Sequence, residues 1–220
     1  MAGILFIISA PSGSGKSTLV AQLRTLVEGL DFSVSYTTRA PRGSETDGRE
    51  YHFVERAAFE GMIERDEFFE WALVFGNYYG TACAALEHAR AAGKDLLLDI
   101  DVQGAKQVMQ KLPAAVSIFI LPPSPEVLEM RLRNRSEAEH VTDPVVIERR
   151  LHQARNELKQ VWDYRYALVN DVLDQATAEL RAIVLSERGV GDGVTATAES
   201  CRTDGRSPRL IAVLKSFGIS

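Results

Sequence analysis

The positions of apolar and polar residues along the chain predict strands that alternate with helices. Ile4 to Ile8 form a continuous apolar run that ends at a Gly/Ser-rich turn, which is typical of a strand buried on both faces of a parallel sheet. From Leu19 to Val27 apolar residues recur at steps of three and four, which predicts a helix with one apolar stripe. Similar runs return at 96–100, 116–121 and 167–169, with helical stretches at 102–112 and 125–134. The alternation predicts an α/β fold with three α/β/α layers around a parallel sheet.

Other segments depart from this pattern. They divide the predicted main domain, residues 1–188, into a core, an inserted subdomain and a lid. Short alternating segments around an aromatic-rich stretch predict an inserted mixed-sheet subdomain over 31–81, so the core comprises 1–30 and 82–188. We expect Trp71 and Phe75 to pack in its core. A polar stretch between two helical segments predicts a small lid at about 134–147. Residues 189–220 are predicted to be a flexible tail with room for a short terminal helix, since 189–208 are rich in Gly, Ser, Thr and Asp.

Composition and charge limit the classes of partner. The 220 residues are 45% hydrophobic and 25% charged, as in an ordinary globular protein, and the net charge of −5 favours neither nucleic acid nor an anionic membrane. The two cysteines are far apart in the sequence, and the four histidines lack the spacing of metal ligands. We expect a cytoplasmic protein, monomeric or homo-oligomeric, whose anionic ligands are held by local positive charge.

Residues 10–18 match the phosphate-binding loop GxxxxGK(S/T), except that Ala10 stands where the pattern has its first glycine. Glycines allow the backbone to wrap around phosphate oxygens, and the helix that follows directs its positive end to the same place. Lys16 is expected to contact the β- and γ-phosphates of ATP, and the Ser17 hydroxyl to bind Mg²⁺. The predicted ATP-binding residues are Ser12, Gly13, Ser14, Gly15, Lys16, Ser17 and Thr18.

The run from Leu96 to Asp101 resembles a Walker B strand, which ends in an acidic residue that supports the metal or its waters. We therefore predict that Asp99 serves the Mg²⁺ ion indirectly, through a water molecule. Because the required strand precedes the phosphate loop and an amphipathic helix follows it, a P-loop NTPase fold explains the segment better than an ordinary turn. These features alone do not separate a kinase from another nucleotide hydrolase.

The inserted region contains the segments Ser35-Tyr-Thr-Thr-Arg-Ala-Pro-Arg42, Asp47-Gly-Arg-Glu-Tyr51, Glu70-Trp71 and Gly76-Asn-Tyr-Tyr-Gly-Thr81. In these segments the chain resembles the guanylate kinase family, bacterial type. Together with Ser9-Ala-Pro-Ser-Gly13 and Leu98-Asp-Ile-Asp-Val-Gln-Gly104, the likeness extends from the N-terminus to about Glu187. The resemblance implies a guanylate kinase domain over 1–188, a transferase of purine nucleotide metabolism that moves the γ-phosphate of ATP to GMP or dGMP and yields GDP and ADP, with Mg²⁺ as cofactor.

The chemistry of these residues agrees with a guanine nucleotide. Arg39 and Arg42 can hold a phosphate through bidentate guanidinium groups, with help from the hydroxyls of Tyr51 and Tyr79. Guanine offers an N1–H and an N2 amino group on one edge, so the carboxylate of Glu70 can accept from both, whereas adenine leaves it unsatisfied.

Further roles follow from the resemblance alone. It implies that Ser35, Thr81 and Asp101 also contact GMP, and that the catalytic residues are Lys16, Arg39, Arg131, Arg135 and Arg150. The lid departs from the family, because it is longer than usual and Ser136 stands where glycine is common. A basic helical face paired with glutamates is the alternative for the lid arginines.

Alternative functions remain open at this point. A P-loop kinase acting on a ribose phosphate would share the phosphate loop but would have no use for Glu70, Ser35 and Thr81. A non-catalytic guanylate-kinase-like binding module typically lacks a working phosphate loop, whereas Gly15, Lys16 and Ser17 are intact here. A simple nucleotide hydrolase would leave the acceptor residues without a function.

Overall fold

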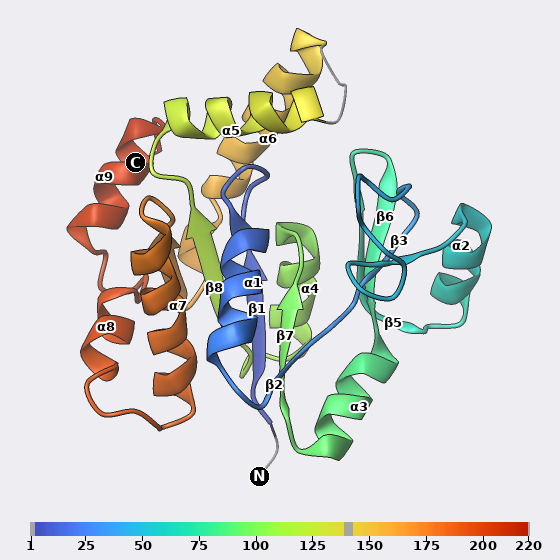
Figure 1. Ribbon diagram of the computed structural model, residues 1–220, viewed down its shortest axis with the longest axis horizontal. Coiled ribbons are helices and arrows are strands. Elements are labelled where there is room, and N and C mark those ends of the chain that lie inside the picture. The colour runs from blue at the N-terminus through green and yellow to red at the C-terminus, as the bar shows by residue number, and fades with distance from the viewer. Residues whose placement is uncertain (1–2, 139–142, 220) are drawn as a thin grey trace. The chain divides into compact units, whose positions relative to one another are not determined.

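The computed structural model describes residues 3–138 and 143–219, and it contains a five-stranded and a four-stranded sheet (Figure 1). The larger sheet has the strand order β2-β7-β1-β8-β9. Its strands are β1 Leu5–Ser9, β2 Leu30–Phe32, β7 Asp95–Asp99, β8 Val116–Leu121 and β9 Tyr166–Val169. The pairings of β2 with β7 and of β8 with β9 are parallel. The predicted α/β fold with a parallel sheet is thus confirmed.

The chain divides into two compact units. The first unit comprises Met1–Ile7 and Gly29–Ala115, and the second comprises Ile8–Glu28 and Val116–Ser220. The first unit holds the four-stranded sheet, in the order β4-β3-β6-β5, with β3 Tyr36–Thr37, β4 His52–Phe53, β5 Phe68–Val74 and β6 Asn77–Ala82. Since β3 pairs parallel with β4 and antiparallel with β6, this sheet is mixed, as predicted.

Aromatic stacking forms part of the core of the first unit. Phe59 of helix α2 (Arg56–Glu64) stacks on Phe68 and on Tyr78, with ring centroids 4.3 Å and 5.1 Å apart. The expectation that Trp71 and Phe75 belong to this core is wrong, because they are 37% and 40% exposed. Trp71 still meets Tyr78 edge to face, with ring centroids 5.7 Å apart, so it lies at the exposed edge of this aromatic cluster.

Two helices of the first unit flank β7 along the chain, namely α3 (Cys83–Ala92) and α4 (Val102–Lys111). Asp101 caps the N-terminus of α4, where its carboxylate accepts from the backbone N–H groups of Gln103 and Gly104. The predicted boundary of the inserted subdomain at residue 31 falls inside β2, which pairs with β7 in the larger sheet. The four-stranded sheet therefore begins at β3.

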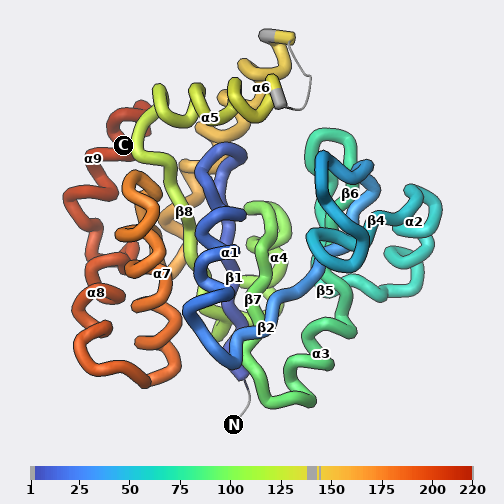
Figure 2. Tube along the Cα trace, viewed as in Figure 1, coloured from blue at the N-terminus to red at the C-terminus, as the bar shows by residue number. Residues whose placement is uncertain are grey.

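The second unit contains helix α1 (Lys16–Leu26) after β1, then α5 (Pro125–Ala138), α6 (Pro144–Leu158), a 3₁₀ turn (Val161–Asp163), α7 (Leu173–Glu187), α8 (Thr195–Ser200) and α9 (Pro208–Ser216). Figure 2 shows α8 beside the lower part of α7, and α9 above α8. Every residue of β8 is buried, as expected for a strand covered on both faces. The predicted lid coincides with the end of α5 and the start of α6, and its residues 139–142 lie outside the described residues.

The C-terminal segment differs from the flexible tail that its composition predicts. Leu210, Leu214 and Phe217 are buried, so the expected terminal helix is present as α9 and packs on the second unit. The polar residues that suggested flexibility make hydrogen bonds to the backbone instead: Ser207 accepts from the N–H of Leu210, and the Thr203 hydroxyl donates to the carbonyl oxygen of Tyr164. Over the described part of the chain, no helix is long and apolar enough to cross a membrane.

Candidate active site

The phosphate-binding loop connects β1 to α1. Gly13 and Gly15 have φ angles of 89° and 84°, which a residue with a side chain rarely adopts, and α1 begins directly after Gly15 at Lys16. The loop therefore places the free N–H groups and the positive end of α1 beside the lysine. The Ser14 hydroxyl is buried and has no hydrogen-bond partner among the described residues. This arrangement is suited to binding a polyphosphate.

Asn170, which follows β9, supports the phosphate-binding loop through a hydrogen bond to its backbone. Its side-chain Nδ2 donates to the carbonyl oxygen of Ser14 at 2.8 Å, and the side chain is buried. A Cβ atom on Gly15 would lie only 2.3 Å from that Nδ2, so a glycine is required there by close approach as well as by its φ angle. Sequence reasoning missed Asn170. The available signal was a polar residue at the carboxyl end of a buried strand, where ligands of α/β proteins commonly bind.

Two of the predicted lid arginines contact the phosphate loop. Arg131 donates to the carbonyl oxygens of Ser14 and Asn170 at 3.5 Å and 3.2 Å, and Arg135 donates to the Ser12 hydroxyl at 3.5 Å. These guanidinium groups come from α5 and bring positive charge to a loop that lacks acidic residues. They are placed to compensate the charge of a bound polyanion.

The third predicted arginine of the lid contacts a different residue. Arg150 of α6 donates to the Ser136 hydroxyl at 3.0 Å, and Ser136 is buried near the end of α5. The contact therefore joins α6 to α5. Arg133, on the exposed side of α5, instead pairs with Glu129 one turn earlier. The basic-face alternative thus describes Arg133, whereas Arg131 and Arg135 turn to the loop.

In the first unit, Glu70 provides a buried carboxylate. It is 2% exposed, and its Oε1 accepts from the hydroxyl of Thr81, which lies opposite it on β6, at 2.6 Å. Burial raises the pKa of Glu70 to about 7, and the charge of Asp101 adds to this effect, although the Thr81 hydrogen bond opposes it. The carboxylate can therefore change its protonation state near neutral pH.

Gly104 allows helix α4 to approach this carboxylate closely. A Cβ atom at Gly104 would lie 2.2 Å from Oε2 of Glu70, which is far inside van der Waals contact. The first turn of α4 thus contacts the second carboxylate oxygen of Glu70, while Thr81 holds the first. Sequence reasoning assigned no role to Gly104, because nothing local shows that α4 and β5 meet there.

Arg39 is the second buried charge of the first unit. It is 8% exposed, donates to the Glu45 carboxylate at 3.0 Å and to the Ala40 carbonyl oxygen at 2.7 Å, and lies 5.3 Å from the centre of the Tyr51 ring. Burial opposes its charge, but the hydrogen bond to Glu45 and the proximity of Tyr79 outweigh burial and raise its pKa. Arg39 is therefore a fixed positive charge.

The remaining predicted acceptor residues belong to the same unit. The rings of Tyr51 and Tyr79 meet edge to face with centroids 5.9 Å apart, and Tyr51 also lies beside Arg39. Arg42 follows in the same loop, and its backbone N–H donates to the Glu45 carboxylate. Ser35 is buried, and its carbonyl oxygen accepts from His52. The ligand contacts of all of these residues stay predictions.

The two predicted metal ligands belong to different units, and their contacts with Mg²⁺ stay predictions. Ser17, in the first turn of α1, is exposed, and Asp99 ends β7 partly exposed. Both offer oxygen atoms, which Mg²⁺ prefers. Within residues 3–138 and 143–219, no three His, Cys, Asp or Glu side chains gather closely enough to hold a metal ion.

Comparison with known proteins gives consistent matches. A family model described as guanylate kinase matches residues 3–187. The guanylate kinase of Koribacter versatilis (strain Ellin345) is 53% identical over 226 residues, covering 99% of this chain and 97% of that protein. That of Nitrosospira multiformis is 49% identical over 186 residues, with coverage of 84% and 87%. The crystal structure of guanylate kinase from Anaplasma phagocytophilum superimposes with a TM-score of 0.70 at 34% identity, covering 84% of this chain and 86% of that one.

Proposed function

The chain belongs to the guanylate kinase family, and from this premise we propose that it transfers the γ-phosphate of ATP to GMP or dGMP, giving ADP and GDP or dGDP. The observation that carries the choice of base is the buried Glu70 carboxylate with its Thr81 hydrogen bond. A carboxylate in this environment is costly unless it finds donors, and the guanine edge supplies two. Adenine has no N1–H and no N2 amino group, so it would leave Glu70 unsatisfied.

The donor nucleotide is assigned to the phosphate loop. Lys16 donates to the β- and γ-phosphates, and the backbone N–H groups from Gly13 to Thr18 surround the β-phosphate. Ser17 and, through water, Asp99 would hold Mg²⁺, which in such a site offsets part of the phosphate charge. The buried Ser14 hydroxyl and the supporting contact of Asn170 are consistent with this assignment.

The acceptor nucleotide is assigned to the first unit. Glu70 and Thr81 select the base, with Ser35 and Asp101 nearby in the proposed site, and the phosphate is held by Arg39, Arg42, Tyr51 and Tyr79. The fixed charge of Arg39, oriented by Glu45, supports this role. Two guanidinium groups and two phenolic hydroxyls provide the donors that a phosphate dianion needs.

The transfer step requires little acid–base chemistry from the protein. The phosphate oxygen of GMP is already anionic near neutral pH, because its second pKa is about 6. The remaining barrier is the repulsion between two polyanions and the charge spread over the moving phosphoryl group. Lys16, Arg131 and Arg135 supply compensating positive charge at the loop. Arg150, which contacts Ser136 in this structure, would add its positive charge when a nucleotide is bound.

A coupled assay of ADP release tests the proposal. With MgATP and a panel of GMP, dGMP, AMP, UMP and ribose 5-phosphate, we expect turnover only with GMP and dGMP. Glu70→Ala should reduce the preference for GMP over AMP by roughly a hundredfold or more, because the selective hydrogen bonds are lost. Equal turnover with AMP, or selectivity that survives in Glu70→Ala, would contradict the assignment of the base site, and turnover with ribose 5-phosphate would favour the alternative kinase.

A further inference from the structure

The C-terminal segment, residues 194–219, adds to the edge of β9 in the second unit. The N–H of Ala167 donates to the carbonyl oxygen of Cys201 at 2.8 Å, and the N–H of Thr203 donates to that of Arg165 at 3.1 Å. Between them, Tyr166 and Arg202 form an antiparallel bridge. The family model ends at residue 187, so the segment lies beyond the part of the chain that the model describes.

Arg209 connects this segment to the end of β9. It stands in the first turn of α9, whose start is fixed by the Ser207 cap. One guanidinium nitrogen donates to the carbonyl oxygen of Val169 at 3.2 Å, and another pairs with the Glu179 carboxylate on α7 at 2.9 Å. Because the Glu179 side chain is only 12% exposed, the ion pair gives Arg209 a defined position.

Val169 directly precedes the residue that supports the phosphate loop. Its carbonyl oxygen also accepts from the N–H of Asp171 at 3.1 Å, which closes a tight turn around Asn170. The N–H of Asn170 donates to Leu121 on β8, and its Nδ2 donates to the Ser14 carbonyl oxygen. Arg209 therefore holds the turn that directs the Asn170 amide at the loop.

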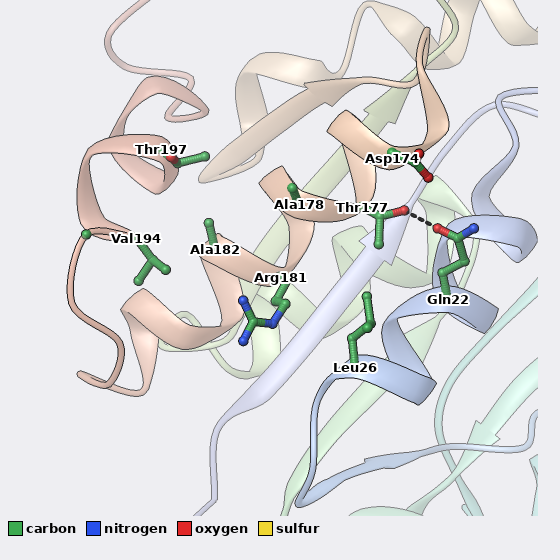
Figure 3. Close-up of a pocket in the computed structure, with 10 residues that line it drawn as sticks. Gln22, Leu26, Asp174, Thr177, Ala178, Arg181, Ala182, Val194 and Thr197 are labelled. Carbon is green, nitrogen blue, oxygen red and sulfur yellow. Dashed lines mark hydrogen bonds between the residues drawn. The ribbon is translucent and has the colours of Figure 1, made fainter.

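Helix α7 also connects the C-terminal segment to helix α1, which follows the phosphate loop. A cavity of about 570 Å³ is lined by side chains from α1, α7 and the start of α8, and Figure 3 shows these side chains. Across it, α7 meets α1 through a hydrogen bond from the Thr177 hydroxyl to Gln22 at 2.5 Å. Val194 and Thr197 line the side of the cavity formed by the C-terminal segment.

We infer that Arg209 is a positioning residue for the phosphate-donor site, acting through the Val169 carbonyl and Asn170 on the Ser14 backbone. It does not touch the nucleotide. The inference rests on the proposed function only in taking ATP as the ligand of the phosphate loop. Fixing the loop before ATP arrives lowers the ordering cost of binding, so the effect belongs to ATP affinity and not to the acceptor.

The test compares full-length variants in steady-state kinetics and in direct ATP binding. Arg209→Gln should raise the KM and the Kd of ATP roughly five- to tenfold, as expected for one lost charge-assisted hydrogen bond, while the KM of GMP stays unchanged. Arg209→Lys, which keeps a charged donor, should restore most of the ATP affinity. Lys215→Gln is the matched control, because it removes the same charge from the exposed side of α9 and should change neither constant.

A double-mutant cycle separates positioning from a general loss of structure. Asn170→Ala should raise the Kd of ATP, and adding Arg209→Gln to it should cause little further change if both act through one contact. Additive effects, an unchanged Kd of ATP in Arg209→Gln, or a parallel rise for ATP and GMP would overturn the inference. Since the Kd of ATP is measured without an acceptor, failure of wild-type protein to phosphorylate GMP would count against the proposed function alone.

Discussion

Among single residues, Glu70 combines a buried carboxylate with a specific hydrogen-bonding chemistry. Its carboxylate is buried between the Thr81 hydroxyl and the first turn of α4. Before a ligand binds, burial raises the pKa of Glu70 to about 7, so much of the unliganded protein holds the proton at neutral pH. Guanine supplies two donors, which favour the ionised form. Binding of GMP should therefore be linked to release of that proton.

This linkage predicts the pH dependence of GMP binding. The Kd of GMP should rise as pH falls below about 7, since the protonated carboxyl cannot accept both guanine donors. Isothermal titration between pH 6 and pH 8.5 measures it, and Glu70→Gln is the control that retains the titration of the GMP phosphate. If wild type and Glu70→Gln follow the same pH profile, the assignment of the titration to Glu70 is wrong.

The same pKa also predicts an effect on the stability of the unliganded protein. An unfolded glutamate titrates near 4.5, so between that pH and about 7 the folded protein holds a proton that the unfolded chain has lost. The contribution of Glu70 to the free energy of unfolding is thus fully present below pH 4.5 and is lost as pH rises through about 7. Urea unfolding at several pH values measures this effect. As pH rises from about 4.5 through 7, the free energy of unfolding should decline less for Glu70→Gln than for wild type.

Gly104 should control base selection without controlling folding. The added methyl group of Gly104→Ala would meet the carboxylate end of the Glu70 side chain, so the carboxylate must move, while alanine favours the helix. We expect the ratio of kcat/KM for GMP over IMP, which lacks the N2 amino group, to fall roughly tenfold with little change in Tm. Gly61→Ala in α2 is the matched control. An unchanged ratio would show that Glu70 does not depend on Gly104.

At the scale of elements, the hydrophobic pattern was sufficient for the buried strands and for most helices. A strand that is buried on both faces, such as β8, has a continuous apolar run in its sequence. A helix that is buried on one side, such as α1, has one apolar stripe. The support of the phosphate loop by Asn170 depends on which strands become neighbours, which no local pattern contains. The close approach of α4 to Glu70 is a tertiary feature of the same kind.

The C-terminal segment shows where composition misleads. Its Gly, Ser and Thr residues resemble those of a linker, but they form caps and turns between few, well-placed apolar residues. The packing of α9 is therefore decided by tertiary contacts and not by the mean polarity of the segment.

Packing of α9 predicts a measurable contribution to stability. Leu214 is 2% exposed, so Leu214→Ala should lower the free energy of unfolding by about 2 to 4 kcal/mol through lost burial and the cavity left behind. Leu26→Ala, at a site that is 50% exposed, is the comparison and should cost much less. Chemical denaturation measures both values. Equal, small losses would indicate that α9 is not packed on the second unit.

For the whole molecule, the proposed function assigns the groups for one substrate to each unit. The second unit has the phosphate loop with Lys16, Asn170 and two arginines of α5, and the first has Glu70, Thr81 and Arg39. Net charge gives no hint of this, because the chain is acidic overall while its arginines are concentrated at particular positions. A kinase needs both groups of residues, whereas a hydrolase needs only the first.

The most direct test follows the labelled γ-phosphate of ATP in a mixture of wild-type protein, Mg²⁺ and equal amounts of GMP and AMP. We predict that the label appears in GDP and that Lys16→Met, which lacks the charge at the phosphate loop, transfers almost none. Label in inorganic phosphate would identify a hydrolase, and equal label in ADP and GDP would show that Glu70 does not select the base. Either result would contradict selective transfer from ATP to GMP.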